Sequence, residues 1–406
     1  MVGEWRDITL GDFVALQRGH DLTEPGRRIG RVPVMGSAGQ NGFHDTALAK
    51  GPGVVIGRSG ASFGQVHFSK EDFWPHNTGL YVTDFKDNDP LFAFYFLKAL
   101  DFDRFNSGSA QPSLNRNFIY PIPIRVPNPA EQKAIAAVLG ALDDKIELNR
   151  RMNATLEAMA RALFQSWFVD FDPVRAKLDG RQPTGLDPAT AALFPEHLED
   201  SPLGHIPKGW TAQRLPDAIE VNPRRTLKSG TIAPYLDMKN LPTQGHSAEE
   251  VIDREFSSGT KFQNGDTLLA RITPCLENGK TGYVDFLEDG QVGWGSTEYI
   301  VLSPKPPLPP QFGYLLARSD ALRTHAIQNM TGTSGRQRVP SECFHNFWLA
   351  VPPPDIARRF DELTAPLMAK IKANSTESRT LATLRVTLLP KLLGGEIGVV
   401  GAAQSL

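Results

Sequence analysis

The side chains with the clearest chemical capability in this sequence are cations and forked hydrogen-bond donors gathered in two polar stretches. One stretch runs from Arg104 to Asn117, and the other runs from Thr331 to Arg338. Lysine and arginine neutralise phosphates, whereas arginine, asparagine and glutamine match the hydrogen-bonding edges of bases. Any one of these side chains is more often simply solvated, but their recurrence at matching places in the chain favours a nucleic-acid surface.

Further polar residues join these stretches at the ends of expected strands and near the start of each half of the chain. Arg58 and Arg271 both follow short β-rich runs, and Gly332 and Gly335 permit close approach of the backbone to a ligand. The candidate DNA contacts are Arg58, Arg104, Asn106, Ser109, Gln111, Asn115, Arg116, Asn117, Arg224, Arg225, Arg271, Lys280, Thr333, Arg336, Gln337 and Arg338.

The motifs of a self-contained active site are incomplete. Gly279-Lys280-Thr281 ends like a phosphate-binding loop, but Pro274 stands where the upstream glycine is required. The stretch from Val351 to Pro354 lacks the polar and aromatic neighbours that flank the Pro-Pro of amino-methyltransferases. The nine histidines form no pair at metal-ligand spacing. We therefore predict that the chain is not an enzyme by itself and binds no metal or cofactor of its own.

The composition is that of an ordinary globular protein, with 40% hydrophobic and 22% charged residues among 406. The net charge is −2, so local basic patches rather than a global field would have to hold any nucleic acid. Two cysteines, Cys275 and Cys343, exclude a disulfide framework and a four-cysteine zinc site. Without a signal peptide or an apolar run long enough to cross a bilayer, we expect a cytoplasmic chain with no membrane partner.

The polar stretches need a frame that positions them, and a long amphipathic run from residue 127 to 171 provides it. Apolar residues recur there at steps of three or four and share one face of a helix. About 41 helical residues at roughly 1.5 Å each give a rod of about 60 Å. Its narrow apolar seam is typical of a coiled coil, so the rod needs a partner.

The partner is predicted within the same chain, because a second run of this kind lies 225 positions further on, with Asn374 at the place of Asn149. A constant offset over some forty residues indicates an internal duplication. A polar residue in such a seam fixes register, so the two rods should meet near their middles. The expected seam residues are Ile135, Leu142, Ile146, Asn149, Leu156, Met159, Leu163, Phe360, Leu367, Ile371, Asn374, Leu381, Leu384 and Leu388.

Two points weigh against this pairing. The two runs would also look alike if they were separate amphipathic helices on the surface, without any contact between them. Pro366 lies near the start of the second rod and should kink or break it, since proline in a helix interior costs about 3 kcal/mol.

Two β-rich globular regions precede the two rods, and they share landmarks such as Trp5 with Trp210 and Pro90 with Pro310. The predicted fold class is α+β, with two similar α/β domains, two long helices packed as an antiparallel coiled coil, and an internal pseudo-two-fold repeat. The predicted parts are a first domain at 1–126, a first helix at 127–171, a linker of little periodicity at 172–207, a second domain at 208–350, a second helix at 351–393 and a tail at 394–406.

Four stretches of the chain resemble the specificity subunit of type I restriction–modification systems, and the likeness covers nearly the whole sequence. They are VPNPAEQK from Val126 to Lys133, LFQSWFVDFDPVRAKLDGR from Leu163 to Arg181, LGHIPKGW from Leu203 to Trp210, and LRVTLLPKLLGGEI from Leu384 to Ile397. The resemblance implies two target-recognition domains, each reading one half of a split double-stranded DNA target, held apart by antiparallel helical spacers.

The resemblance also implies partners that carry the chemistry. The subunit is itself not catalytic in that family; it docks two modification subunits, which use S-adenosylmethionine to methylate adenine. Two restriction subunits can join as further partners and add ATP- and magnesium-dependent translocation and cleavage. This sequence departs from the family pattern where the second copy reads Pro354-Asp355-Ile356-Ala357-Arg358, so docking at the two copies need not be equal.

Two other functions remain open from the residues alone. A stand-alone nuclease or methyltransferase would be active without a partner. A scaffold would bind proteins with its two globular units in place of DNA, whereas contacts to phosphates would make binding to duplex DNA depend steeply on salt.

Overall fold

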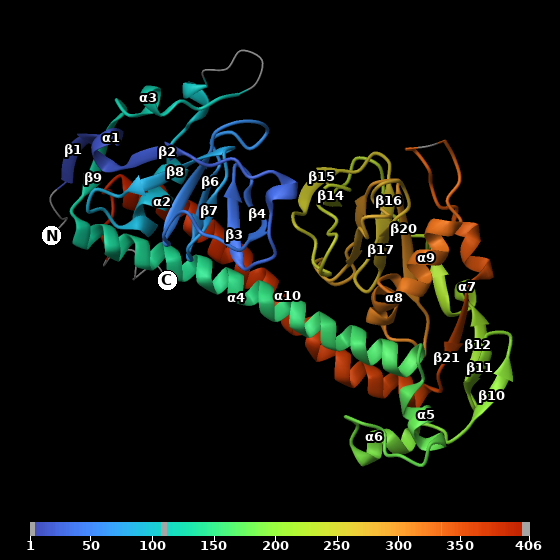
Figure 1. The fold of residues 1–406 in the computed structure, drawn as a ribbon. Helices are drawn as coiled ribbons and strands as arrows, with labels where there is room; N and C mark the ends of the chain where they lie inside the picture. Colours follow the sequence, from blue (N-terminus) through green and yellow to red (C-terminus); the bar gives the residue numbers. More distant parts are fainter. Residues whose placement is uncertain (1–4, 107–111, 334, 400–406) are drawn as a thin grey trace. The chain divides into compact units, whose positions relative to one another are not determined.

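The computed structural model describes residues 5–106, 112–333 and 335–399. The chain divides into two compact units. The first unit contains the chain up to Glu147 together with the chain from Ser378, and the second unit runs from Leu148 to Glu377. Strands and helices are mixed in both (Figure 1). Within the described ranges, no helix is both long enough and apolar enough to cross a membrane.

An antiparallel four-stranded sheet in the order β2-β8-β5-β6 forms the centre of the first unit. Its central strand β5 (Gly53–Gly57) is buried along its whole length, as its β-branched residues suit a strand covered on both faces. The other strands are β2 (Ala15–Arg18), β8 (Gly79–Asp84) and β6 (Val66–Ser69).

Smaller sheets and short helices surround this centre. Helix α2 (Pro90–Ala99) begins at Asp89, whose carboxylate accepts a hydrogen bond of 2.8 Å from the Phe92 amide. The remaining strands are β3 (Val32–Gly36), β4 (Gly39–His44) and β7 (Trp74–Pro75) in one sheet, with β1 (Trp5–Thr9) and β9 (Pro123–Pro127) in another. The remaining helices are α1 (Leu10–Phe13), η1 (Glu24–Gly26), η2 (Asp103–Phe105) and α3 (Arg116–Ile119).

The second unit repeats this plan. Its antiparallel sheet has the order β13-β20-β17-β18, with β13 (Ile219–Val221), β20 (Tyr299–Pro304), β17 (Thr267–Ala270) and β18 (Thr281–Tyr283). Strand β12 (Thr211–Arg214) pairs with β21 (Trp348–Val351), as β1 pairs with β9. The same succession of pairings occurs in each unit, and this supports the predicted similarity of the two domains.

The other elements of the second unit complete its body. A further sheet contains β14 (Ile232–Leu236), β15 (Ile252–Glu255), β16 (Thr260–Phe262) and β19 (Gly293–Gly295). The helices are α7 (Leu215–Ala218), α8 (Pro310–Ala317), α9 (Asp320–Gln328) and η3 (Ser341–Asn346).

The predicted linker contains secondary structure that its weak periodicity did not indicate. It carries α5 (Asp172–Leu178), α6 (Pro188–Leu193) and the hairpin of β10 (Leu198–Ser201) and β11 (Gly204–Pro207). Prolines occupy the first turns of both helices, and Asp187 caps α6 by accepting a 3.0 Å hydrogen bond from the Thr190 amide. The prolines and glycines therefore mark the ends of short elements instead of an irregular segment.

Helices α4 (Pro129–Phe168) and α10 (Pro354–Leu393) each contain 40 residues. Within the first unit, Leu139 and Leu142 of α4 belong to the same buried cluster as Leu388 and Leu392 of α10. The expectation of a break at Pro366 is wrong, because α10 continues through it. Pro366 lies on the exposed face of the helix, where water can bind the carbonyl that loses its intrahelical donor.

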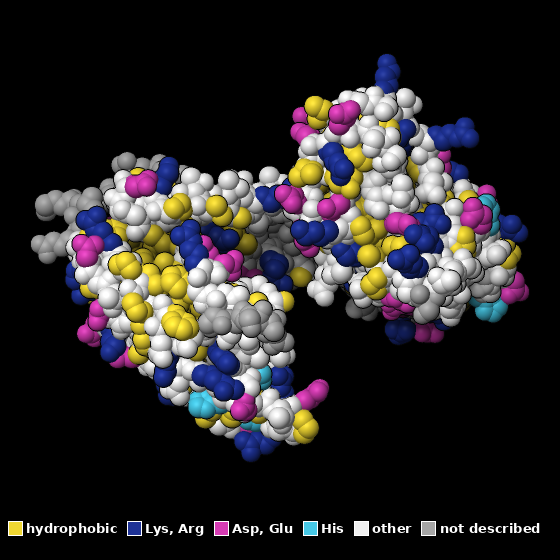
Figure 2. All heavy atoms as spheres, turned by 90° about the horizontal axis from the view of Figure 1, so that it is seen from above, with side chains coloured by type: hydrophobic (Ala, Val, Ile, Leu, Met, Phe, Trp, Pro, Cys, Tyr) yellow, Lys and Arg dark blue, Asp and Glu magenta, His cyan; other side chains and the backbone are white. Residues whose placement is uncertain are grey.

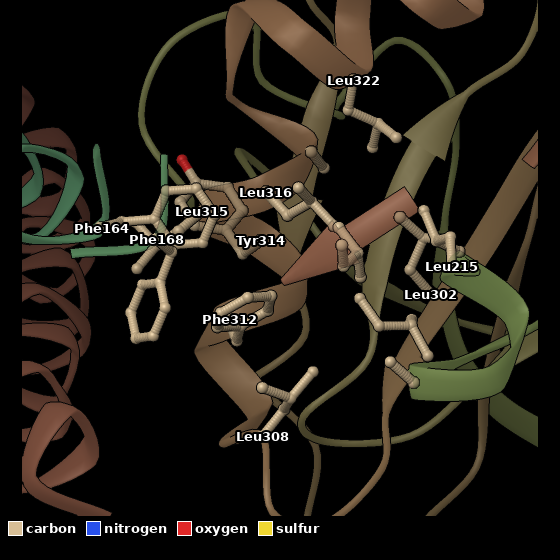
Figure 3. Packing of buried hydrophobic residues seen from close by; sticks show 14 of the residues in the cluster. Phe164, Phe168, Leu215, Leu302, Leu308, Phe312, Tyr314, Leu315, Leu316 and Leu322 are labelled. Atoms are coloured by element: carbon tan, nitrogen blue, oxygen red, sulfur yellow. The ribbon is translucent and has the colours of Figure 1, made fainter. Parts of the chain in front are cut away.

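Within the second unit, the two helices run antiparallel and meet through polar and aromatic contacts. The Asn149 Nδ2 donates to the Asn374 carbonyl at 3.4 Å, and the Asn374 Nδ2 donates to Asn153 Oδ1 at 2.9 Å. Further along, the Phe168 and Phe360 rings lie 4.8 Å apart. Figure 3 shows Phe164 and Phe168 beside Phe312 of α8, with ring separations of 5.0 and 5.1 Å to it.

Most predicted seam residues are shielded from solvent in the structure. Those that are buried are Ile135, Leu142, Asn149, Phe360, Ile371, Asn374 and Leu388, and those that are partly buried are Ile146, Leu156, Leu163, Leu367, Leu381 and Leu384. The assignment of Met159 to the seam is wrong, since half of it is exposed (50%). The buried residues of that turn are Glu157 and Ala160. Glu157 can be buried because its carboxylate accepts a hydrogen bond of 2.7 Å from the Tyr314 hydroxyl.

Candidate nucleic-acid interface

In the first unit, the polar stretch is fixed to the end of the central strand β5. The amide of Arg58, the residue after β5, donates to the Thr78 carbonyl at 2.9 Å. The Arg58 carbonyl in turn accepts from the Leu114 amide at 2.8 Å, and Ser59 forms an isolated bridge with Ser113. Ser113 and Leu114 of the predicted polar loop therefore lie against the sheet edge next to Arg58.

The second unit has the same backbone arrangement at the end of β17. The Arg271 amide donates to the Glu298 carbonyl at 2.9 Å, and the Arg271 carbonyl accepts from the Val339 amide at 2.8 Å. Leu114 and Val339 are both buried, so each anchors its loop to its own unit. Since 114 and 339 differ by the offset of the duplicated helices, the two loops occupy equivalent places.

Several predicted contacts of the first unit lie at this edge and have partners within it. Arg58 is half-buried and its Nη1 donates to the Asn77 carbonyl at 3.2 Å. The Asn106 Oδ1 accepts from the Ser113 amide at 3.0 Å, and the exposed Arg104 forms an ion pair of 2.8 Å with Asp101. Asn115 caps α3 by accepting from the exposed Asn117. Ser109 and Gln111 lie outside the described residues.

Three predicted contacts have structural partners that sequence reasoning could not supply. Arg225 donates to the buried carboxylate of Asp266 at 2.7 Å, and only 20% of its side chain is exposed. The Lys280 ammonium donates to the Met238 and Lys239 carbonyls at 2.6 and 2.8 Å. The Arg116 Nη1 donates to the Leu16 carbonyl at 2.7 Å. The charges of Arg225 and Lys280 are directed into the fold, which argues against their assignment as DNA contacts, whereas Arg116 is exposed and its assignment stays a prediction.

The remaining predicted residues of the second unit, apart from Arg224, lie at Arg271 or in the loop that is anchored to it. Arg224, Thr333 and Arg336 are exposed, and Gln337 is half-buried. The Gln337 carbonyl accepts from the Thr273 amide at 3.0 Å, which fixes the loop beside β17. Figure 1 shows the segment that carries this loop extending beyond α9.

The sharpest geometry in the loop belongs to Arg338. Its Nε and Nη2 donate to the Glu298 carboxylate at 2.7 to 2.9 Å, and Glu298 precedes β20 directly. Hydrogen bonds from this carboxylate raise the pKa of the Arg338 guanidinium above its usual value, so the group keeps its charge at any physiological pH. Both partners come from the same edge of the sheet.

Sequence reasoning missed polar residues that the strand order brings to the same edges. His20, His76 and Asn77 lie beside Arg58, since His20 bridges His76 and the Asn77 amide donates to the His20 carbonyl at 3.0 Å. Glu298 takes the corresponding place in the second unit. The available signal was position, because His76 directly follows β7 and Glu298 directly precedes β20.

The charges on the visible surface are mixed. Figure 2 shows Lys and Arg side chains interspersed with Asp, Glu and apolar side chains on the face in view. Among the described residues, no group of three His, Cys, Asp or Glu side chains is placed to hold a metal ion. The candidate interface therefore consists of hydrogen-bonding edges with a few exposed cations.

Known proteins resemble this chain in sequence and in fold. Residues 3–158 match the type I restriction modification DNA specificity domain. The chain is 24% identical over 332 residues to the type I restriction enzyme HindI specificity subunit of Haemophilus influenzae, covering 70% of this chain and 71% of that protein. It is 27% identical over 307 residues to the MjaIX specificity subunit of Methanocaldococcus jannaschii, covering 72% of this chain and 65% of that protein.

The fold has a solved counterpart. The crystal structure of a type I restriction-modification system S subunit from M. genitalium superposes with a TM-score of 0.60 at 17% identity, covering 96% of each chain. That likeness concerns the fold alone. The resemblance to specificity subunits of type I restriction–modification systems is thus confirmed, with residues 3–158 matching the DNA specificity domain of that family.

Proposed function

We propose that this chain is a non-catalytic recognition subunit that reads a bipartite double-stranded DNA target, one half-site with each unit. The observation that carries the proposal is the repeated sheet edge. In each unit, the arginine that follows the central strand donates its amide to the residue before the neighbouring strand, and its carbonyl accepts a hydrogen bond from the polar loop. A recognition site built twice on one scaffold, with different side chains, suits a target with two different half-sites.

The two long helices would set the distance between the half-sites. A helix of 40 residues is about 60 Å long, which is close to two turns of DNA at about 34 Å each. Readers attached toward opposite ends of an antiparallel helix pair would meet the same side of the duplex two turns apart. The helices would then determine how many base pairs remain unread between the half-sites.

The chemistry would reside in partner subunits. We expect two modification subunits that bind S-adenosylmethionine and methylate adenine, and restriction subunits that add ATP- and magnesium-dependent cleavage where the host has them. The complex would act in the cytoplasm, where the DNA is. This chain would supply the DNA sequence preference.

Insertion of four residues into both α4 and α10 tests the spacing role, because four residues add about one helical turn to each rod. Methylated sites would be mapped across the genome of cells that carry the full chain with its modification subunit. We expect a longer unread spacer between two unchanged half-sites. Altered half-sites with an unchanged spacer would contradict the proposal.

Dependence on salt separates DNA recognition from a protein-binding role. If the exposed arginines contact phosphates, affinity for duplex DNA should fall steeply and log-linearly with salt concentration. Binding to a partner protein with no salt-dependent binding to duplex DNA would favour the scaffold alternative.

A further inference from the structure

The second unit holds one arginine in a fixed orientation at its reading edge, the sheet edge next to Arg271 that is proposed to meet DNA. The Arg338 Nε donates to both carboxylate oxygens of Glu298 at 2.9 Å, and its Nη2 donates to Oε1 at 2.7 Å. Only Nη1 is directed elsewhere, toward the Arg336 carbonyl at 3.5 Å, which is near the limit for a hydrogen bond. Of its five N–H donors, those on Nη1 and the second on Nη2 therefore point away from the carboxylate.

The backbone under this pair is fixed on both sides. Glu298 is tied to Arg271 through its carbonyl, and Arg338 exchanges backbone hydrogen bonds of 2.8 and 2.9 Å with Thr331. The side chain of Glu298 is 24% exposed, and that of Arg338 is 45% exposed. The guanidinium is therefore open to a ligand while its long side chain has lost much of the freedom that usually weakens surface contacts.

The first unit lacks this pair at the equivalent positions. By the matching backbone bonds, Thr78 corresponds to Glu298, and Ser113 corresponds to Arg338. The Thr78 hydroxyl accepts from the Ser37 amide at 3.1 Å and lies 3.0 Å from His76 Nδ1. One scaffold position thus carries an acid–base pair in one unit and neutral hydroxyls in the other, which is the pattern expected of residues that set the sequence preference.

The ion pair is poorly suited to holding a phosphate. Its net charge is zero, so it adds little to the long-range attraction that phosphates exert on cations. A guanidinium that keeps two adjacent N–H groups free matches the O6 and N7 acceptors of guanine in the major groove, which no other base presents together. Arginine is better suited to this contact than lysine because its fork is planar and rigid.

We propose that Arg338 reads a guanine in the half-site of the second unit and that Glu298 is the positioning residue that orients its fork. The inference rests on the proposed function, because it names a base within the target that the chain is proposed to recognise. Glu298 itself need not touch the DNA.

The test replaces each partner with its closest analogue in the full chain, co-expressed with the modification subunit. Arg338→Lys keeps the charge but removes the fork, and Glu298→Gln keeps the shape but removes the charge that orients the arginine. Arg181→Lys is the matched control, since Arg181 is an exposed arginine that also forms an ion pair of 2.7 Å, but with Asp179 in the segment after α5. Methylated sites are mapped for each, and the thermal unfolding curve of each variant is compared with that of the native chain.

We expect one half-site of the native target to contain a guanine that becomes degenerate in Arg338→Lys, with discrimination at that position falling on the order of ten- to a hundredfold. Glu298→Gln should relax the same position by less. The other half-site, the spacer and the unfolding curve should stay unchanged, and Arg181→Lys should behave like the native chain.

Three results would overturn the inference. They are an unchanged motif in Arg338→Lys, degeneracy at a base other than guanine, and equal weakening at all sites, which would identify a phosphate contact. If the native chain with its modification subunit gives no bipartite motif, then the proposed function itself fails.

Discussion

The two units use one scaffold and differ where they would meet DNA and where they meet the long helices. Their central sheets have the same strand order, and Arg58 and Arg271 make the same backbone hydrogen bonds. The reading edge of the first unit carries neutral and histidine side chains, whereas that of the second carries the Glu298–Arg338 pair. Under the proposed function, exchange of these edge residues on a shared backbone would change the DNA sequence preference without a change of fold.

The attachment to the helices differs in a similar way. In the first unit, the Tyr95 hydroxyl donates to Asp143 of α4 at 2.7 Å, and Asp143 also pairs with Arg385 of α10. In the second unit, Tyr314 donates to Glu157, which is almost fully buried, and accepts from the Arg318 Nε at 3.1 Å. The second attachment has less access to water, so breaking it should cost more.

The largest expected effect distinguishes the two kinds of arginine in the second unit. Arg225→Ala would strand the buried Asp266 carboxylate, and we expect a loss of stability of about 3–5 kcal/mol. The neighbouring Arg224 is exposed, so Arg224→Ala should change stability by less than about 0.5 kcal/mol while lowering DNA affinity. Hydrogen exchange of the second unit and binding to duplex DNA would measure the two effects.

The loss caused by Arg225→Ala should also depend on pH. Burial already raises the pKa of Asp266 above its usual value, and removing the arginine should raise it further. Protonation at lower pH would then neutralise the stranded carboxylate and reduce the loss. A loss that is constant with pH would contradict the buried ion pair.

Removal of one hydroxyl compares the helix attachments directly. Tyr314→Phe leaves the Glu157 carboxylate and the Arg318 Nε without a shared partner, at a cost of about 1–3 kcal/mol. Tyr95→Phe should cost less, about 0.5–1.5 kcal/mol, because Asp143 keeps Arg385 and is partly open to water. Equal losses of stability for the two variants in unfolding experiments would mean that the burial of Glu157 does not add to the cost.

Alkaline pH should destabilise the second unit more steeply than the first. Burial raises the pKa of Tyr283, Tyr299 and Tyr314 in the second unit, and that of Tyr95 and Tyr81 in the first. Above pH 10 the unfolded chain releases these protons first, so stability falls as pH rises and is unaffected below pH 10.

The expected loss is up to about 1.4 kcal/mol per pH unit for each tyrosine that stays protonated only when folded. Hydrogen exchange at rising pH, corrected for the intrinsic exchange rate and resolved by unit, checks the order of loss. Earlier loss of protection in the first unit would contradict it.

The sequence predicts the helices and strands of this molecule better than it predicts the side-chain contacts between them. The spacing of apolar residues predicts both long helices, because local periodicity reports which face is buried. It does not identify Glu157 as buried in place of Met159, since the tyrosine that satisfies this acid lies more than a hundred residues away. The predicted break at Pro366 likewise comes from a local rule, that proline disrupts a helix interior. The rule does not hold here because Pro366 lies on an exposed face of α10.

The candidate site also divides into features that local sequence predicts and features that depend on distant residues. Loop composition predicts both polar loops, and the similar β-rich runs that end at Arg58 and Arg271 predict the two arginines. Composition cannot distinguish Arg225 or Lys280 from exposed cations, because their partners come from strands and loops distant in sequence. Glu298 is missed for the opposite reason, since an acid alone does not indicate a DNA-reading edge.

Methylation mapping of Arg336→Ala beside the native chain tests the central claim most directly. Arg336 is exposed in the loop of the second unit, and the loss of one base contact should cost about 1–3 kcal/mol. We predict that one half-site becomes relaxed while the other half-site and the spacer between them are retained. Simultaneous change in both half-sites, or a continuous motif without a spacer in the native chain, would contradict two independent readers on one scaffold.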